Sequence, residues 1–127
     1  ESILSNKTIS VYNHGKMKRD FTYINDIVKG IIAAIEYRFN KNSKTNHTIY
    51  NLGNNNPISI LKMISIIEKV TGNKAKKKFM PIQPGDVRET YADIIKSKKN
   101  IKFNPTTKLD EGIKSFVDWY KAYHKIK

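Results

Sequence analysis

The sequence has 127 residues, of which 39% are hydrophobic, and a formal net charge of +13 at pH 7. This length fits one domain with a modest core, and the longest apolar run, Gly30 to Ile35, is far shorter than the ~18 to 20 residues that a membrane span needs. The sequence has no cysteine, which excludes disulfides and thiolate metal sites and favours a reducing, cytoplasmic setting with no membrane partner.

The positive charge comes almost entirely from lysine. Only three of the 24 basic residues are arginine, the residue that most often binds bases and phosphates. The lysines gather in groups, but no recognised nucleic-acid motif accompanies them. We therefore expect a solvated lysine-rich surface and no nucleic-acid partner. The groups are Lys74, Lys76, Lys77 and Lys78, then Lys96, Lys98 and Lys99, and finally Lys121, Lys125 and Lys127.

The chain opens with residues that favour strands. Thr8 to Tyr12 is β-branched and aromatic, Asn13 to Lys16 has turn chemistry, and Arg19 to Ile24 is a second extended run. Asn25 or Asp26 is expected to cap the helix that follows. The apolar residues of this helix recur at three- and four-residue spacing, at Ile27, Val28, Ile31, Ile32, Ile35 and Phe39.

A second strand-to-helix unit is expected in the middle of the chain. A polar loop at 40–46 precedes a short strand, Thr48 to Leu52, and a turn at Gly53 to Pro57. Ser59 is expected to cap a helix that Gly72 ends. The apolar residues of that helix are Ile60, Leu61, Ile64, Ile67 and Val70.

The rest of the chain continues this alternation. Extended segments are expected at Lys78 to Ile82 and at Glu89 to Ala92, with a helix from about Asp93 to Lys99. Thr107 and Asp110 resemble a capping box in front of a terminal helix. This order of elements predicts an α/β fold. One face of the terminal helix carries Leu109, Ile113, Phe116, Val117 and Tyr120.

Two segments carry candidate binding groups. Arg19, beside a glycine-bearing turn, can offer its guanidinium to a diphosphate, although a surface pair with Asp20 or Asp26 is the more ordinary explanation. Tyr12 can stack on a flat base or pack in the core.

In the second segment, residues 83–88, Pro84 and Gly85 bend the chain. Asp86 can then project its carboxylate toward both hydroxyls of a ribose, with Arg88 on the same side and able to reach phosphate. An ordinary turn in which Asp86 pairs with Arg88 is the alternative.

Four segments, in this order and spacing, resemble the last third of the extended short-chain dehydrogenases/reductases, and among them the UDP-glucuronate 4-epimerases most. The resemblance implies the C-terminal substrate-binding part of an extended Rossmann-type protein, without its main NAD-binding sheet. The segments are Ile9 to Asn13 with Gly15 and Arg19 to Ile24, Tyr50 to Asn54, Gln83 to Val87 with Thr90 to Asp93, and Phe103 to Thr107 with Glu111 to Ile113.

The resemblance also implies a set of substrate contacts, with a UDP-sugar as the partner. Ser10 and Tyr12 would line the uracil, Arg19 would hold the diphosphate, and Asp86 would bind the ribose. Gln83 and Arg88 would add polar contacts to the diphosphate.

By the same resemblance, NAD and the catalytic residues belong to a part of the enzyme upstream of this chain, and so does the homodimer interface. Residues 1–127 would then be a single substrate-binding domain or fragment, inactive alone and with apolar surface exposed. A sister dehydratase or decarboxylase and a free-standing basic binding module remain alternatives.

The remaining motifs support no assignment within this chain. Its six glycines are too dispersed for a Gly-x-Gly-x-x-Gly turn. Tyr37 with Lys41 and Tyr123 with Lys127 have the Tyr-x-x-x-Lys spacing, but a sequence so rich in lysine is expected to contain such matches by chance. The histidines His14, His47 and His124 lack metal-ligand spacing. We assign no catalytic, cofactor-binding or metal-binding residue.

Overall fold

The computed structural model describes residues 1–39 and 47–126, so the loop expected at 40–46 lies outside the described residues. Short strands alternate with helices, and the predicted α/β class is confirmed. The elements are β1 (Thr8–Val11), the 3-10 turn η1 (Tyr12–Gly15), β2 (Lys18–Arg19), α1 (Ile24–Glu36), β3 (Ile58–Ser59), α2 (Ile60–Thr71), β4 (Lys76–Phe79), α3 (Ile95–Ile101) and α4 (Leu109–Tyr123).

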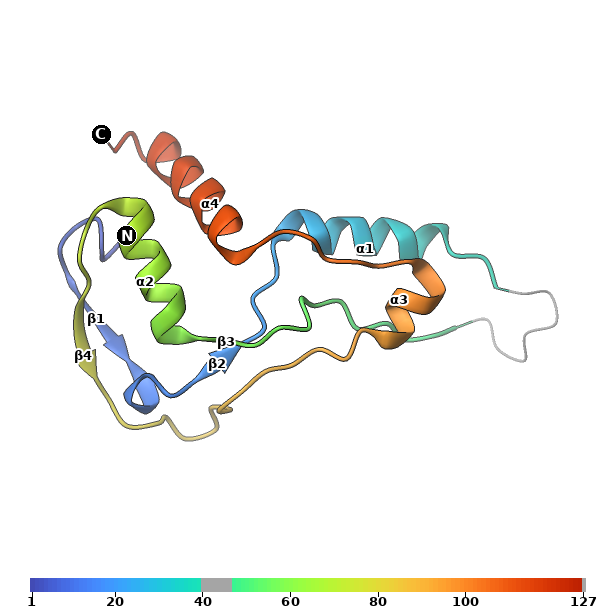
Figure 1. Ribbon diagram of the computed structural model, residues 1–127, viewed down its shortest axis with the longest axis horizontal. Coiled ribbons are helices and arrows are strands. Elements are labelled where there is room, and N and C mark those ends of the chain that lie inside the picture. Colours follow the sequence, from blue (N-terminus) through green and yellow to red (C-terminus); the bar gives the residue numbers. More distant parts are fainter. Residues whose placement is uncertain (40–46, 127) are drawn as a thin grey trace.

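The strands form two small two-stranded sheets. β1 pairs in parallel with β4, and β2 pairs antiparallel to β3. In Figure 1, β1 and β4 lie side by side at the left with α2 next to them, whereas α1 and α3 lie at the opposite end. Val11 of β1 is only 2% exposed, and Lys77 of β4 reaches Glu68 of α2. One face of the β1–β4 sheet is therefore directed toward α2.

Helix α2 begins and ends as its sequence predicts. The Ser59 hydroxyl accepts a hydrogen bond from the backbone N–H of Lys62 at 3.2 Å. Gly72 has a φ of 74°, and its N–H donates to the Glu68 carbonyl at 2.9 Å. Both caps satisfy backbone groups that a helix end leaves unpaired, so they need no tertiary partner.

Helix α1 has a different start from the one predicted. Its N-cap is Tyr23, without a side-chain hydrogen bond, and neither Asn25 nor Asp26 caps it. Asp26 lies in the first turn at 2% exposure, and its Oδ2 accepts hydrogen bonds from the N–H groups of Thr106 and Thr107 at 3.3 and 3.0 Å. Asp26, predicted as a cap, thus forms tertiary hydrogen bonds that link α1 to the segment before α4; we call these contacts the Asp26 tie.

The capping box predicted for the terminal helix is also wrong. α4 has Lys108 as its N-cap, with no side-chain hydrogen bond. The N–H of Thr107, which a capping box would pair with Asp110, donates to Asp26 instead. The helix contacts α2, and a Cβ added to Gly112 would lie 3.0 Å from the ring of Tyr23. Close approach to Tyr23 therefore favours glycine at this position.

Several predicted strands are shorter than expected or absent. The run Arg19 to Ile24 forms a strand only at β2, and Thr48 to Leu52 forms none, because no described strand lies beside its backbone. Glu89 to Ala92 contributes only an isolated bridge between Lys18 and Glu89. The segment predicted at Lys78 to Ile82 is β4, which begins two residues earlier and ends at Phe79. The helix predicted from Asp93 is α3, which begins at Ile95.

The apolar face of α1 lies largely on the surface. A small core forms around Ile94, Ile101 and Phe103, which pack against Leu52 and the inner side of α1. Ile24 and Ile35, at the two ends of the helix, remain 62% and 72% exposed. The helix was predicted from its apolar spacing, but no described element covers that face. None of the described helices has the length and hydropathy to cross a membrane.

The Asp26 tie leads to a first prediction. Replacing Asp26 with alanine leaves the N–H groups of Thr106 and Thr107 without their charged acceptor and should lower the free energy of unfolding by about 1.5 to 3 kcal/mol. Urea unfolding followed by circular dichroism measures this loss. Asp118→Ala is the control, because Asp118 is exposed and pairs only with Lys114 in the described chain; it should cost under about 1 kcal/mol.

The same tie has a pH dependence. Burial by itself raises the pKa of Asp26, but the hydrogen bonds from Thr107 and Thr106 and the nearby Lys29 lower it overall below its usual 3.8. The stabilisation is therefore present above the unfolded-state pKa and is lost as the pH falls through the lowered folded-state pKa. Equal acid sensitivity of wild type and Asp26→Ala would contradict this assignment.

Candidate functional site

The predicted substrate residues come from three segments that the fold places side by side. Ser10 and Tyr12 belong to β1 and η1, Arg19 to β2, and the others to the loop after β4. This loop follows the first segment through backbone hydrogen bonds from Met80 N to Val11 O (2.9 Å) and from His14 N to Met80 O (3.0 Å). Further along, Lys18 N donates to Arg88 O at 2.9 Å. Residues 80–90 thus run beside residues 11–20.

Arg19 and Asp86 form the centre of this site. Nη2 of Arg19 lies 2.7 Å from Oδ1 of Asp86, and the two side chains are 23% and 30% exposed. The Nη1 group donates to the carbonyl of Lys18 at 2.8 Å. Both alternative pairings considered for these residues are wrong, since Arg19 pairs with neither Asp20 nor Asp26, and Asp86 does not pair with Arg88. The second oxygen of Asp86 accepts no hydrogen bond from the described residues.

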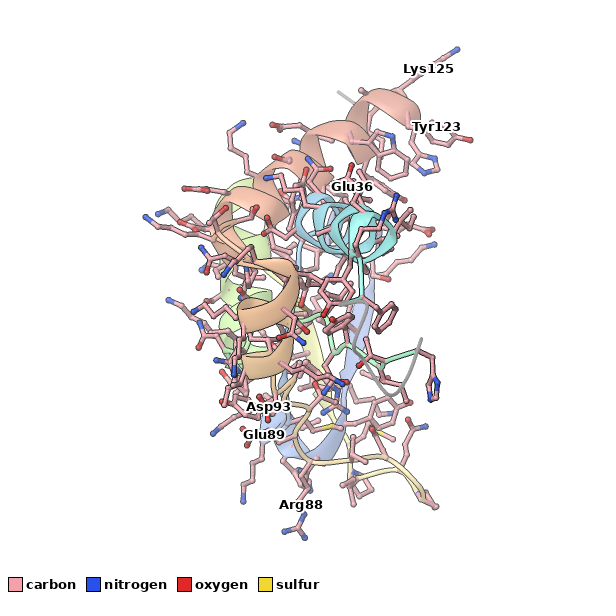
Figure 2. All side chains as sticks on the ribbon, turned by 90° about the vertical axis from the view of Figure 1, so that its right-hand side faces the viewer. Glu36, Arg88, Glu89, Asp93, Tyr123 and Lys125 are labelled. Atoms are coloured by element: carbon pink, nitrogen blue, oxygen red, sulfur yellow. The ribbon has the colours of Figure 1, made fainter. Side chains whose placement is uncertain are left out.

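The other four predicted residues surround this pair more loosely. Ser10 is exposed, Tyr12 is half-buried, and Gln83 and Arg88 are exposed. In Figure 2 the side chain of Arg88 points outward from the molecule. Its backbone carbonyl accepts the hydrogen bond from the N–H of Lys18. The structure therefore brings Arg19 and Asp86 together but does not direct Arg88 toward them.

A left-handed turn joins β1 to β2 next to the site. Asn13, His14 and Gly15 have φ values of 48°, 51° and 78°. A Cβ added to Gly15 would lie 2.8 Å from Cγ of Leu61 on α2, so glycine is required both for the backbone angle and for the packing. The turn chemistry predicted here is confirmed, and it positions Tyr12 at the end of the sheet.

The structural role of Asp20 was not predicted from the sequence. Its Oδ2 accepts hydrogen bonds from the N–H groups of Asn55 (3.0 Å) and Ala92 (3.1 Å), and its Oδ1 accepts one from Asn56 (3.1 Å). Gly53 is packed so closely that an added Cβ would lie 2.3 Å from Cβ of Ala92. Asp20 thus joins three separate segments directly beside Arg19. All three of its partners are backbone groups, which the sequence does not distinguish.

Glu68 of α2 bonds to residues around the start of β4, on the face of the β1–β4 sheet that is directed toward α2. Its Oε1 accepts hydrogen bonds from Lys77 Nζ at 2.6 Å and from Ala75 N at 2.9 Å, and Lys74 Nζ lies 3.9 Å from Oε2. The hydrogen bond from Lys77, followed by that from Ala75, lowers the pKa of Glu68 below its usual range. Two of the clustered lysines therefore have a structural partner.

Metal-ligating clusters and glycine-rich strand-to-helix turns are the features that would mark a metal or dinucleotide site. No group of three or more metal-ligating side chains occurs among the described residues. β1 leads into the left-handed turn and β4 into the loop at 80–94, so neither strand passes through a glycine-rich turn into a helix. A dinucleotide is normally held by a glycine-rich turn between a strand and a helix, and the described connections from β2 to α1 and from β3 to α2 contain no such turn either.

Comparison with known proteins identifies the family. A sequence model of the family described as GDP-mannose 4,6 dehydratase matches residues 2–116. The chain belongs to this NAD-dependent epimerase/dehydratase family.

Its relatives include an uncharacterized protein of Methanocaldococcus jannaschii, 47% identical over 94% of this chain and 35% of that protein. UDP-glucuronate 4-epimerase 5 of Arabidopsis thaliana is 38% identical over 98% of this chain and 31% of its own length. The chain thus spans about a third of these curated relatives.

The fold is also found in solved structures. The UDP-glucuronic acid 4-epimerase from Bacillus cereus, in complex with UDP-glucuronic acid and NAD, aligns with a TM-score of 0.83 at 34% identity. The alignment covers 96% of this chain and 38% of that protein. The resemblance found in the sequence motifs is confirmed at the level of the family and of the fold.

The contacts of Asp20 lead to a second prediction. Asp20→Ala removes the acceptor of three backbone N–H groups and should lower the free energy of unfolding by at least about 1.5 to 3 kcal/mol. Asp20→Asn keeps one side-chain oxygen as an acceptor, so its free energy of unfolding should fall by less than that of Asp20→Ala. Guanidinium unfolding of wild type, Asp20→Asn and Asp20→Ala measures the order of their stabilities. Identical midpoints for wild type and Asp20→Ala would refute the tie.

Proposed function

We propose that this chain is the nucleotide-sugar-binding part of an NAD-dependent 4-epimerase that interconverts UDP-glucuronate and UDP-galacturonate. The observation that carries the proposal is the 2.7 Å pair of Arg19 and Asp86. These residues, 67 positions apart, are the two that the family resemblance links to neighbouring parts of one ligand, the diphosphate and the ribose. Their contact supports a continuous nucleotide site.

Each proposed contact matches the chemistry of its residue. Arg19 uses two of its N–H groups within the protein and keeps the others for phosphate oxygens. The second carboxylate oxygen of Asp86 is available to ribose hydroxyls. Ser10 and Tyr12 would line the base, and Gln83 and Arg88 would reach the diphosphate when the substrate is bound.

The nucleotide site has a clear purpose in such a reaction. Inversion at C4 requires the sugar to turn over after it loses a hydride, so the substrate must be held by a part that does not react. Binding energy from the remote nucleotide provides that anchor. NAD, when bound, supplies the hydride acceptor, and we expect it to be held outside the residues of this chain.

The remaining expectations belong to this proposal. We expect residues 1–127 to act as one substrate-binding unit, inactive without NAD-binding and catalytic residues. We also expect the active enzyme to be a cytoplasmic homodimer.

The description of the matching family as a dehydratase favours one second candidate, the same region of a nucleotide-sugar dehydratase, with a sister decarboxylase as its variant. A polypeptide that joins this chain to its NAD-binding region, incubated with UDP-glucuronate and NAD, should yield UDP-galacturonate of unchanged mass. Loss of water or of carbon dioxide, detected by mass spectrometry, would instead identify the second candidate. The chain without that region should give no product.

The Arg19–Asp86 site leads to a direct binding prediction. Arg19→Ala and Asp86→Ala should each weaken binding of UDP to the chain by about 1.5 to 3 kcal/mol, as expected for hydrogen bonds to charged groups. Isothermal titration calorimetry measures the change. Arg38→Ala is the matched control: Arg38 follows α1, bonds to the Ile35 carbonyl, and should leave the affinity unaltered.

The double variant adds a sharper readout. Because Arg19 and Asp86 contact each other, their effects should be non-additive, with an interaction energy of about 0.5 to 3 kcal/mol. Wild-type affinity in both single variants, with circular dichroism showing the native fold, would remove these residues from the site.

A further inference from the structure

The lysine group at 74–78 divides between two faces of the β1–β4 sheet. Lys77 and Lys74 approach Glu68 of α2 at 2.6 and 3.9 Å. Lys76 and Lys78 alternate with Lys77 along β4, so their side chains project from the opposite face. Both are exposed, and neither forms an ion pair within the described part of the chain. The sheet therefore carries two unneutralised cations on the face directed away from α2.

The strand register places one of these cations next to the proposed base site. Ser10 of β1 is the direct partner of Lys78 in the parallel pair, and Thr8 is the partner of Lys76. Residues directly paired in a sheet project to the same face, and Ser10 is exposed as Lys78 is. Val11, the next residue of β1, is buried on the other face. A flat base resting over Ser10 would thus lie within reach of the Lys78 ammonium.

The chemistry of lysine then makes this contact selective. An ammonium has three hydrogen-bond donors and no acceptor. It can donate to the O4 carbonyl of uracil, whereas cytosine presents an amino group at this position. The O2 carbonyl is common to both bases, so the contact at O4 is the one that discriminates. A donor that meets a second donor leaves both unpaired and repels it electrostatically, so a lysine at this position favours a keto base over an amino base.

We propose that Lys78 is a specificity-determining residue of the nucleotide site, which donates a hydrogen bond to the O4 carbonyl of the pyrimidine and thereby selects uracil over cytosine. The inference rests on the proposed function, because that proposal places the base over Ser10. It adds a residue from β4 to a site otherwise formed by β1, η1, β2 and the loop at 83–88. Lys76, one pair further along the sheet, lies beside Thr8 and is assigned no base contact.

The test compares the affinities of UDP and CDP for the chain by calorimetry. Wild type should bind UDP at least about 10-fold more tightly than CDP, which corresponds to about 1.4 kcal/mol. Lys78→Met should weaken the binding of UDP, so that the UDP and CDP affinities come to within about twofold of each other. Lys78→Arg keeps a hydrogen-bond donor and should retain most of the preference for UDP. Lys76→Met is the matched control: it removes an equal charge from the same face and should weaken both nucleotides equally.

The outcomes separate this inference from the proposed function. If the folded wild-type chain binds neither UDP nor UDP-glucuronate, the proposed function itself fails. The assignment of Lys78 alone is wrong if UDP binds, its affinity depends on Arg19, and one of two results is found. Either the wild type binds UDP and CDP equally tightly, or Lys78→Met prefers UDP as strongly as the wild type does. An equal loss of preference in Lys76→Met would show a general charge effect and also overturn it.

Discussion

The hydrogen bonds of the Asp20 carboxylate are the constraint on which this structure most depends. They join β2 to the turn at 53–56 and to Ala92, three segments that share no long strand. A carboxylate that accepts several backbone N–H groups replaces the ladder that a longer sheet would provide. Because Asp20 fixes the backbone beside Arg19, it also fixes where the Arg19 guanidinium meets Asp86. The same contacts thus support the fold and the candidate site.

Other carboxylates hold the periphery in a similar way. Asp26 ties the start of α1 to residues 106 and 107, and Glu68 ties α2 to β4. Such ties matter in a chain whose described core is small and whose α1 helix leaves its apolar stripe uncovered. The chain covers about a third of its curated relatives, so an exposed apolar face is compatible with its being one part of a larger protein.

Lysine-rich composition and local structure have to be interpreted together here. The net charge of +13 suggests a uniformly basic surface, yet one β-strand divides its lysines by alternation. Lys77 neutralises Glu68 and stabilises the sheet, while Lys78 lies beside Ser10 at the proposed base site. Charge counts alone cannot make this distinction, because the strand pairing decides which face each ammonium occupies.

The sequence by itself determined the α/β class, the extent of α2 between Ser59 and Gly72, a turn at Asn13 to Lys16 and the family motifs. Propensities, caps and turn chemistry depend on residues that are close in sequence. The sequence could not determine the partners of Asp20 and Asp26, since both carboxylates bond to backbone N–H groups distant in sequence. Nor could it show that Thr48 to Leu52 lacks a described strand partner, or that Arg19 meets Asp86. Those features depend on which segments lie side by side, and only the tertiary structure decided that.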